Sequence, residues 1–118
     1  MSHELSPKDR PEIIVLHNNL RELISSLRMF LDTENYNYLE RAHRIKEKIK
    51  TETKTEWLSG FDDLDRNITA IHNVWRESGG DFRDFVHGRL LDQAVYSLVR
   101  ANIMATGLEF KMKRMRKG

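Results

Sequence analysis

The chain has 118 residues, enough for one domain around a single hydrophobic core, and it contains no cysteine. The lack of cysteine excludes a disulfide framework and a thiolate metal site. Its longest mostly apolar stretch, Ile13 to Leu16, is far shorter than the roughly 20 residues that span a bilayer. The first residues also lack the apolar core of a secretory signal, so we expect a cytoplasmic protein without a membrane span.

The formal net charge is only +2, but the charges are unevenly distributed along the chain. A basic cluster occupies the last eight positions and consists of Lys111, Lys113, Arg114, Arg116 and Lys117. The rest of the chain is slightly acidic, so we divide the sequence into a helical domain at 1–110 and a basic tail at 111–118. Such a tail can bind an anionic partner by releasing counterions. The alternative is a solvated helix end, where cations stabilise the negative end of the helix dipole.

The first predicted helix starts after Asp9, which can cap it while Glu12 completes a capping box. Apolar residues follow at spacings of three and four as far as Leu31, and they fall on one stripe at about 100° per residue. The polar break at 32–35 then introduces a second predicted helix at 35–56. Alternating threonines near its end favour a strand, but no second strand candidate exists to pair with them.

The third predicted helix, at 61–77, ends at a pair of glycines that interrupts the helical pattern. Its apolar residues share one face: Phe61, Leu64, Ile68, Ile71 and Trp75. The fourth predicted helix covers 81–115 and is the longest. Four amphipathic helices joined by short loops predict an all-α fold, an antiparallel four-helix bundle with a long C-terminal helix.

A heptad pattern with gaps of four and three runs along the fourth predicted helix. It consists of His87, Leu91, Ala94, Leu98, Ala101, Ala105, Leu108, Met112 and Met115. This face can pack on the other helices of the same chain or on a second copy. At about 1.5 Å per residue, the fourth helix would extend roughly 20 Å beyond the first.

We therefore predict a homodimer interface on the far half of that helix. Its predicted residues are Ala101, Ala105, Leu108, Met112 and Met115. The alternative is that Gly107 ends the helix early, so that the last residues fold back or fray.

Four of the five histidines fall one per predicted helix, and two of them are followed by a carboxylate. This order, over roughly 16–95, is similar to that of the hemerythrin-like di-iron four-helix bundles. The resemblance implies a di-iron site for sensing oxygen or iron. The residues that match it are His17, His43, Glu47, His72, His87 and Asp92.

The helical geometry of these residues opposes a metal site. At about 100° per residue, Glu47 and Asp92 point away from the apolar faces, whereas bundle ligands must face inward. Arg76 also stands where the family has a second histidine on the third helix, and a cation beside a metal is unfavourable. We therefore predict no metal and no cofactor, with the histidines at the surface and His87 beside the core.

The sequence contains neither a phosphate-binding loop nor a nucleophile elbow, and no serine stands in a recognisable catalytic setting. We therefore predict a non-enzymatic helical interaction or regulatory protein. It would self-associate and bind a protein partner, with the basic tail on an anionic surface. One alternative is the hemerythrin-like metal protein. The other is an accessory subunit that binds nucleic acid through the tail, which the slightly acidic body disfavours.

Overall fold

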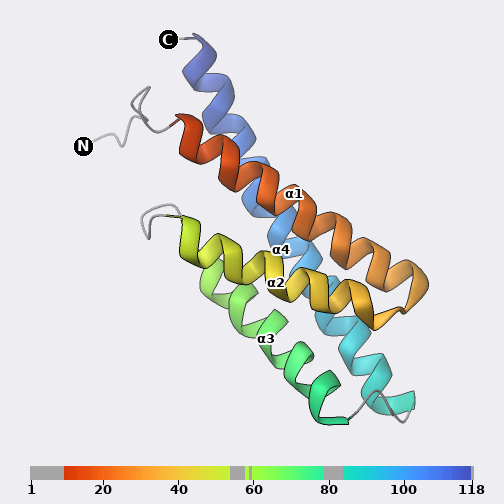
Figure 1. The fold of residues 1–118 in the computed structure, drawn as a ribbon. Helices are drawn as coiled ribbons and strands as arrows, with labels where there is room; N and C mark the ends of the chain where they lie inside the picture. Colours follow the sequence, from red (N-terminus) through yellow and green to blue (C-terminus); the bar gives the residue numbers. More distant parts are fainter. Residues whose placement is uncertain (1–9, 54–57, 59, 79–83, 118) are drawn as a thin grey trace.

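The computed structural model describes residues 10–53, 58, 60–78 and 84–117, without the side chains of 10, 78, 84–86 and 115–117. The described part consists of helices and contains no strand (Figure 1). The helices are α1 Arg10–Thr33, α2 Tyr36–Glu52, α3 Phe61–Ser78 and α4 Asp84–Lys117. The predicted all-α class with four helices is therefore confirmed, while the predicted cap Asp9 lies outside the described residues.

Helix α1 buries the stripe that its sequence predicts, and it turns sharply into α2. Leu20, Leu23 and Leu27 are fully buried along this stripe. At the end of α1, Glu34 adopts a left-handed conformation with φ 56°, and its N–H donates to the Phe30 carbonyl at 2.7 Å. The Asn35 side chain then accepts a hydrogen bond from the backbone N–H of Asn37 at 3.0 Å and caps α2. This short connection lets α2 pack directly against α1.

Helix α1 packs against α2 and α4, and α3 packs against the same two helices. The four helices form an elongated body of 53 × 23 × 22 Å (Figure 1). The larger of two core clusters contains residues of all four helices, among them Leu20, Ile49 and Leu64. A smaller cluster includes Phe30 and Leu90, where the end of α1 meets the first turns of α4. No helix in the described part is long and apolar enough to cross a membrane.

Helix α4 continues unbroken past Gly107 as far as Lys117, so the alternative in which this glycine ends the helix is wrong. Ala101, Ala105 and Leu108, expected to lie uncovered, are instead buried in the larger core cluster of their own chain. Met112 packs partly against the same cluster, and the Met115 side chain lies outside the described residues. The expectation of an uncovered far half is wrong because α1 runs alongside this part of α4. These residues are not a free surface for a second copy.

Candidate interaction surface

The histidines that resemble di-iron ligands do not converge. The Nε2 atom of His17 lies 3.0 Å from the Glu109 carboxylate of α4. His43 and His72 lie together between α2 and α3, and His87 contacts the loop between α1 and α2. Among the residues that the structure describes, no group of three histidine or carboxylate side chains can hold a metal ion. The described part of the chain therefore offers no ligand set to the di-iron alternative.

Lys46 of α2 is 0% exposed and is held in a polar cluster between α2 and α3. Its Nζ atom lies 2.9 Å from Asp65 Oδ1, 2.6 Å from Glu47 Oε1 and 2.5 Å from Thr69 Oγ1. These three oxygens match the three donors of an ammonium group. Burial raises the pKa of Asp65, but hydrogen bonds from Lys46 and Lys50 outweigh it and leave the pKa below its usual value. The buried charge is therefore fully paired, which makes this cluster structural.

Sequence reasoning missed the burial of Lys46, although a signal was present. At about 100° per residue, Lys46 lies between Leu39 and Ala42 on the helical wheel of α2. Both of these neighbours are fully buried. A lysine placed inside an apolar stripe must either extend its ammonium group to the surface or find a buried acidic partner. Here it finds Asp65 on α3.

The imidazole rings of His43 and His72 stack between α2 and α3, with centroids 4.0 Å apart and planes 4° from parallel. His72 and also His17 are buried, so the expectation that these two histidines lie at the surface is wrong. His43 Nδ1 and His72 Nε2 are buried and have no hydrogen-bond partner among the described residues. Glu40 approaches His72 Nε2 only to 3.9 Å, which is too long for a hydrogen bond.

The surroundings of both stacked rings favour the neutral form of the imidazole. Burial lowers the pKa of His43, and the adjacent His72 and Lys46 lower it further. Burial also lowers the pKa of His72, where Glu40 opposes the effect and Arg76 adds to it. Two neutral stacked rings are compatible with a packed interface between α2 and α3, whereas two imidazolium ions at this distance would repel each other.

His87 lies beside the smaller core cluster, as predicted, and joins α4 to the loop between α1 and α2. Its Nδ1 atom lies 2.5 Å from the Tyr36 hydroxyl, and its Nε2 atom contacts the Glu34 carboxylate. The Tyr36 ring stacks on Trp75 of α3, with centroids 5.8 Å apart. Burial, and then the charge of Glu34, raise the pKa of Tyr36, the opposite of what an activated nucleophile requires. This hydrogen-bonded set therefore fixes the loop against α4.

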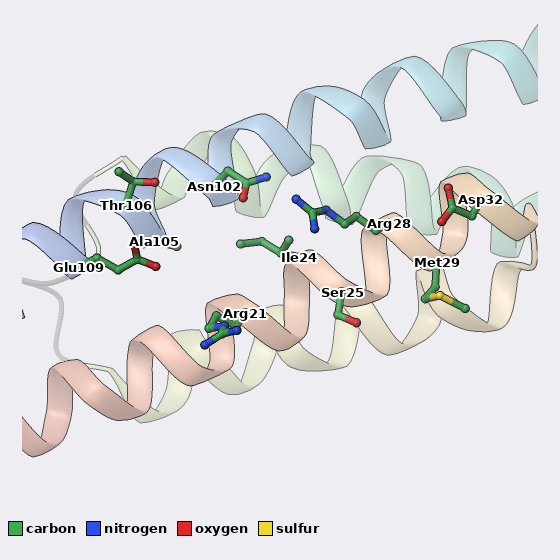
Figure 2. A pocket seen from close by; sticks show the side chains of 10 residues that line it. All are labelled: Arg21, Ile24, Ser25, Arg28, Met29, Asp32, Asn102, Ala105, Thr106 and Glu109. Atoms are coloured by element: carbon green, nitrogen blue, oxygen red, sulfur yellow. The ribbon is translucent and has the colours of Figure 1, made fainter.

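A groove of about 560 Å³ runs between α1 and α4 (Figure 2). Arg21 and Arg28 line it from α1, and Figure 2 shows the guanidinium of Arg28 reaching toward the α4 side. Asp32 and Glu109 also line it, so its charges are of both signs. Glu109 is already engaged by His17. The groove therefore indicates no particular class of ligand.

A row of large apolar side chains covers the side of α4 that faces away from the core. We call this row the outer face of α4; it consists of Val95, Tyr96, Val99, Ile103 and Phe110, each between 46% and 62% exposed. At about 100° per residue, these positions are centred roughly 180° from the buried residue Ala101. Helix α4 is therefore apolar on two opposite sides, of which the described part of the chain buries one.

Sequence reasoning missed the outer face because it followed one heptad pattern along α4 and did not look for a second. Tyr96, Val99, Ile103 and Phe110 have spacings of three, four and seven, which are also heptad spacings. Heptad spacing of this kind is typical of a helix face that packs against another helix. Within the described part of the chain, the pattern that contains Ala101 is packed in the core, whereas the outer face is exposed.

The predicted basic tail forms the last turns of α4 and is not a separate segment. Figure 1 shows these turns extending past the beginning of α1. Lys111, Lys113 and Arg114 are exposed, and the Lys113 ammonium lies 5.9 Å from the centre of the Phe110 ring. The side chains of Arg116 and Lys117 lie outside the described residues. The described cations therefore adjoin the end of the outer face.

Comparisons of this chain with models of protein families, with curated proteins and with solved structures gave no match. The function is therefore inferred from the geometry of this chain alone. Among its described features, the outer face of α4 is the largest group of exposed apolar side chains on one element.

Proposed function

We propose that this protein is a non-enzymatic interaction protein that binds a helical protein partner through the outer face of α4. The observation that carries the proposal is the exposure of five large apolar side chains in one row along α4. Single exposed apolar residues are ordinary, but a contiguous apolar patch is typical of an interaction site. Covering such a patch stabilises a complex by about 25 cal/mol for each Å² of apolar surface buried.

The scaffold of this interaction protein is an antiparallel four-helix bundle. Its support is the order of contacts between neighbouring helices. His17 near the start of α1 meets Glu109 near the end of α4, whereas Phe30 near the end of α1 shares a cluster with Leu90. A bundle of this kind presents α4 as a straight, rigid element. A rigid helix loses little conformational entropy when it binds another helix.

The exposed cations of the tail add an electrostatic component to this binding. Lys113 and Arg114 lie one turn beyond Phe110, so a partner on the outer face would meet them next. Charges at the edge of an interface accelerate and orient association more than they increase affinity. The partner is therefore expected to carry acidic groups at this end, and salt should weaken the complex.

Photo-crosslinking in extracts of cells that produce the protein tests this function. A benzophenone amino acid at position 103, on the outer face, should give covalent protein adducts, and their yield should fall as salt is raised in the extract. The matched control position is 15, because Val15 is 47% exposed on α1 and also apolar. The proposal is wrong if position 103 gives no adducts, or no more than position 15.

A further inference from the structure

Charged residues of opposite sign lie beyond the two ends of the outer face of α4. Asp92 and Arg114 lie eleven residues before and eleven residues after Ile103. At about 100° per residue, both project from the same side of α4 as the apolar row. Both are exposed, and neither is engaged in an ion pair with any residue that the structure describes.

Two pairs of positions between these charges lie symmetrically about Ile103, although Val95 of the outer face has Lys111 at its symmetric position. Tyr96 and Phe110 lie seven residues on either side of it, and Val99 and Gly107 lie four residues on either side. A two-fold axis beside Ile103 would therefore place Tyr96 against Phe110 of the partner. It would also place Val99 against Gly107, where a Cβ atom would have nothing within 4 Å in the isolated chain. An aromatic pair and a large residue opposite a small one are favourable contacts between helices.

We infer that the partner of the outer face is a second copy of this chain, with the two α4 helices packed antiparallel about a two-fold axis beside Ile103. This inference rests on the proposed function and names its partner. The charges determine the direction of the pairing. Antiparallel helices bring Asp92 of each copy to Arg114 of the other, whereas parallel helices would place like charges together. A two-fold interface uses the same surface on both copies, which this symmetry of the sequence allows.

The Tyr96 ring is already held in position for this contact by Arg100. The Arg100 guanidinium lies 5.8 Å from the centre of the Tyr96 ring and donates to Asp63 of α3 at 2.9 Å. At the other end, Lys113 lies against the Phe110 ring. Each aromatic ring of the row thus has a cation over it in the isolated chain. Preordered side chains lose less entropy when the second copy binds.

Sedimentation equilibrium of the intact purified chain tests the dimer. At tens of micromolar, the mass is expected to be twice the 14.0 kDa of one chain. Ile103→Glu is expected to raise the dissociation constant by at least about tenfold, because it places two like charges at the centre of the interface. Val15→Glu on α1 is the matched control and should leave the dimer intact. Circular dichroism checks that both variants remain helical.

Disulfide trapping tests the direction of pairing, because the native chain contains no cysteine. Ile103→Cys should form a covalent dimer. A mixture of Val99→Cys and Gly107→Cys chains should form the mixed disulfide, whereas Val99→Cys alone should not. In the antiparallel pair the two copies of position 99 lie roughly 12 Å apart along the axis, beyond the reach of a disulfide. Efficient crosslinking of Val99→Cys with itself would show a parallel pair and overturn the inference.

A monomer mass for the intact chain, or a dimer that Ile103→Glu leaves unchanged, would also overturn the inference. These failures are distinguishable from failure of the proposed function. If the chain is monomeric but position 103 crosslinks to a different protein, the outer face binds a partner of another sequence and only the homodimer is wrong. If position 103 gives no adducts at all, both proposals are wrong.

Discussion

Removing Asp65 from the buried cluster is expected to destabilise the protein more than removing Lys46, its partner. Asp65→Ala leaves the Lys46 ammonium at 0% exposure with only Glu47 and Thr69 as partners. Lys46→Met instead removes the buried charge and keeps most of the side-chain volume. Asp65 then retains Lys50, whose Nζ atom lies 3.1 Å from its other oxygen. The two variants thus separate the loss of a partner from the loss of the whole ion pair.

The expected size of the difference follows from the burial of each group. Removing one partner of a buried ion pair costs about 3–5 kcal/mol, whereas replacing the charge by an apolar side chain of similar volume is often neutral or stabilising. The Asp65 side chain is 20% exposed, and Glu47 stays on the ammonium, so we use a lower value. We expect a loss of about 2–3 kcal/mol for Asp65→Ala and a change within about 1 kcal/mol for Lys46→Met.

Urea denaturation followed by circular dichroism measures both free energies of unfolding. Urea is preferred because it is uncharged, whereas guanidinium would screen the ion pair. All variants must be compared at one protein concentration, because self-association makes the apparent stability depend on concentration. Equal losses for the two variants, or a larger loss for Lys46→Met, would refute the reasoning that an unpaired buried ammonium is the main cost.

Two further outcomes are expected. The pKa values of His43 and His72 are lowered in the folded chain. Near and below about pH 6.5, the unfolded chain therefore binds more protons than the folded chain. The free energy of unfolding should consequently fall as the pH drops from 7 through this range. Urea midpoints measured across this range give the fall in stability, and His72→Phe should make that fall smaller. If the variant shows the same dependence of stability on pH as the unmodified chain, the stacked histidines are not its cause. Glu34→Ala should be less stable than Glu34→Gly by about 1 kcal/mol. Both variants lose the contact with His87, but only alanine has a Cβ atom, which is strained at φ 56°. Thermal melts of the two variants decide this, and equal stability would mean that the left-handed backbone is not strained.

The sequence alone determined the helices and the face that each one buries. The spacing of apolar residues along α1 predicts its buried stripe, because a helix repeats every 3.6 residues whatever it packs against. The polar break at 32–35 and the paired glycines after α3 predict where helices end, because capping and backbone freedom are local properties. The end of α1, the start of α2 and both ends of α3 therefore agree with the structure to within about two residues, whereas α2 ends at Glu52, before the predicted 56.

Only the tertiary structure decided which helix covers which face. Periodicity predicted that Ala105 and Leu108 face a neighbouring helix, but not that α1 of the same chain covers them. It also did not show that Lys46 meets Asp65 or that His43 stacks on His72, since both pairs join different helices. Such contacts depend on the relative position of two helices along their axes, which is determined by packing over the whole core. For the same reason, the outer face of α4 became recognisable only once the opposite face had been shown to be buried.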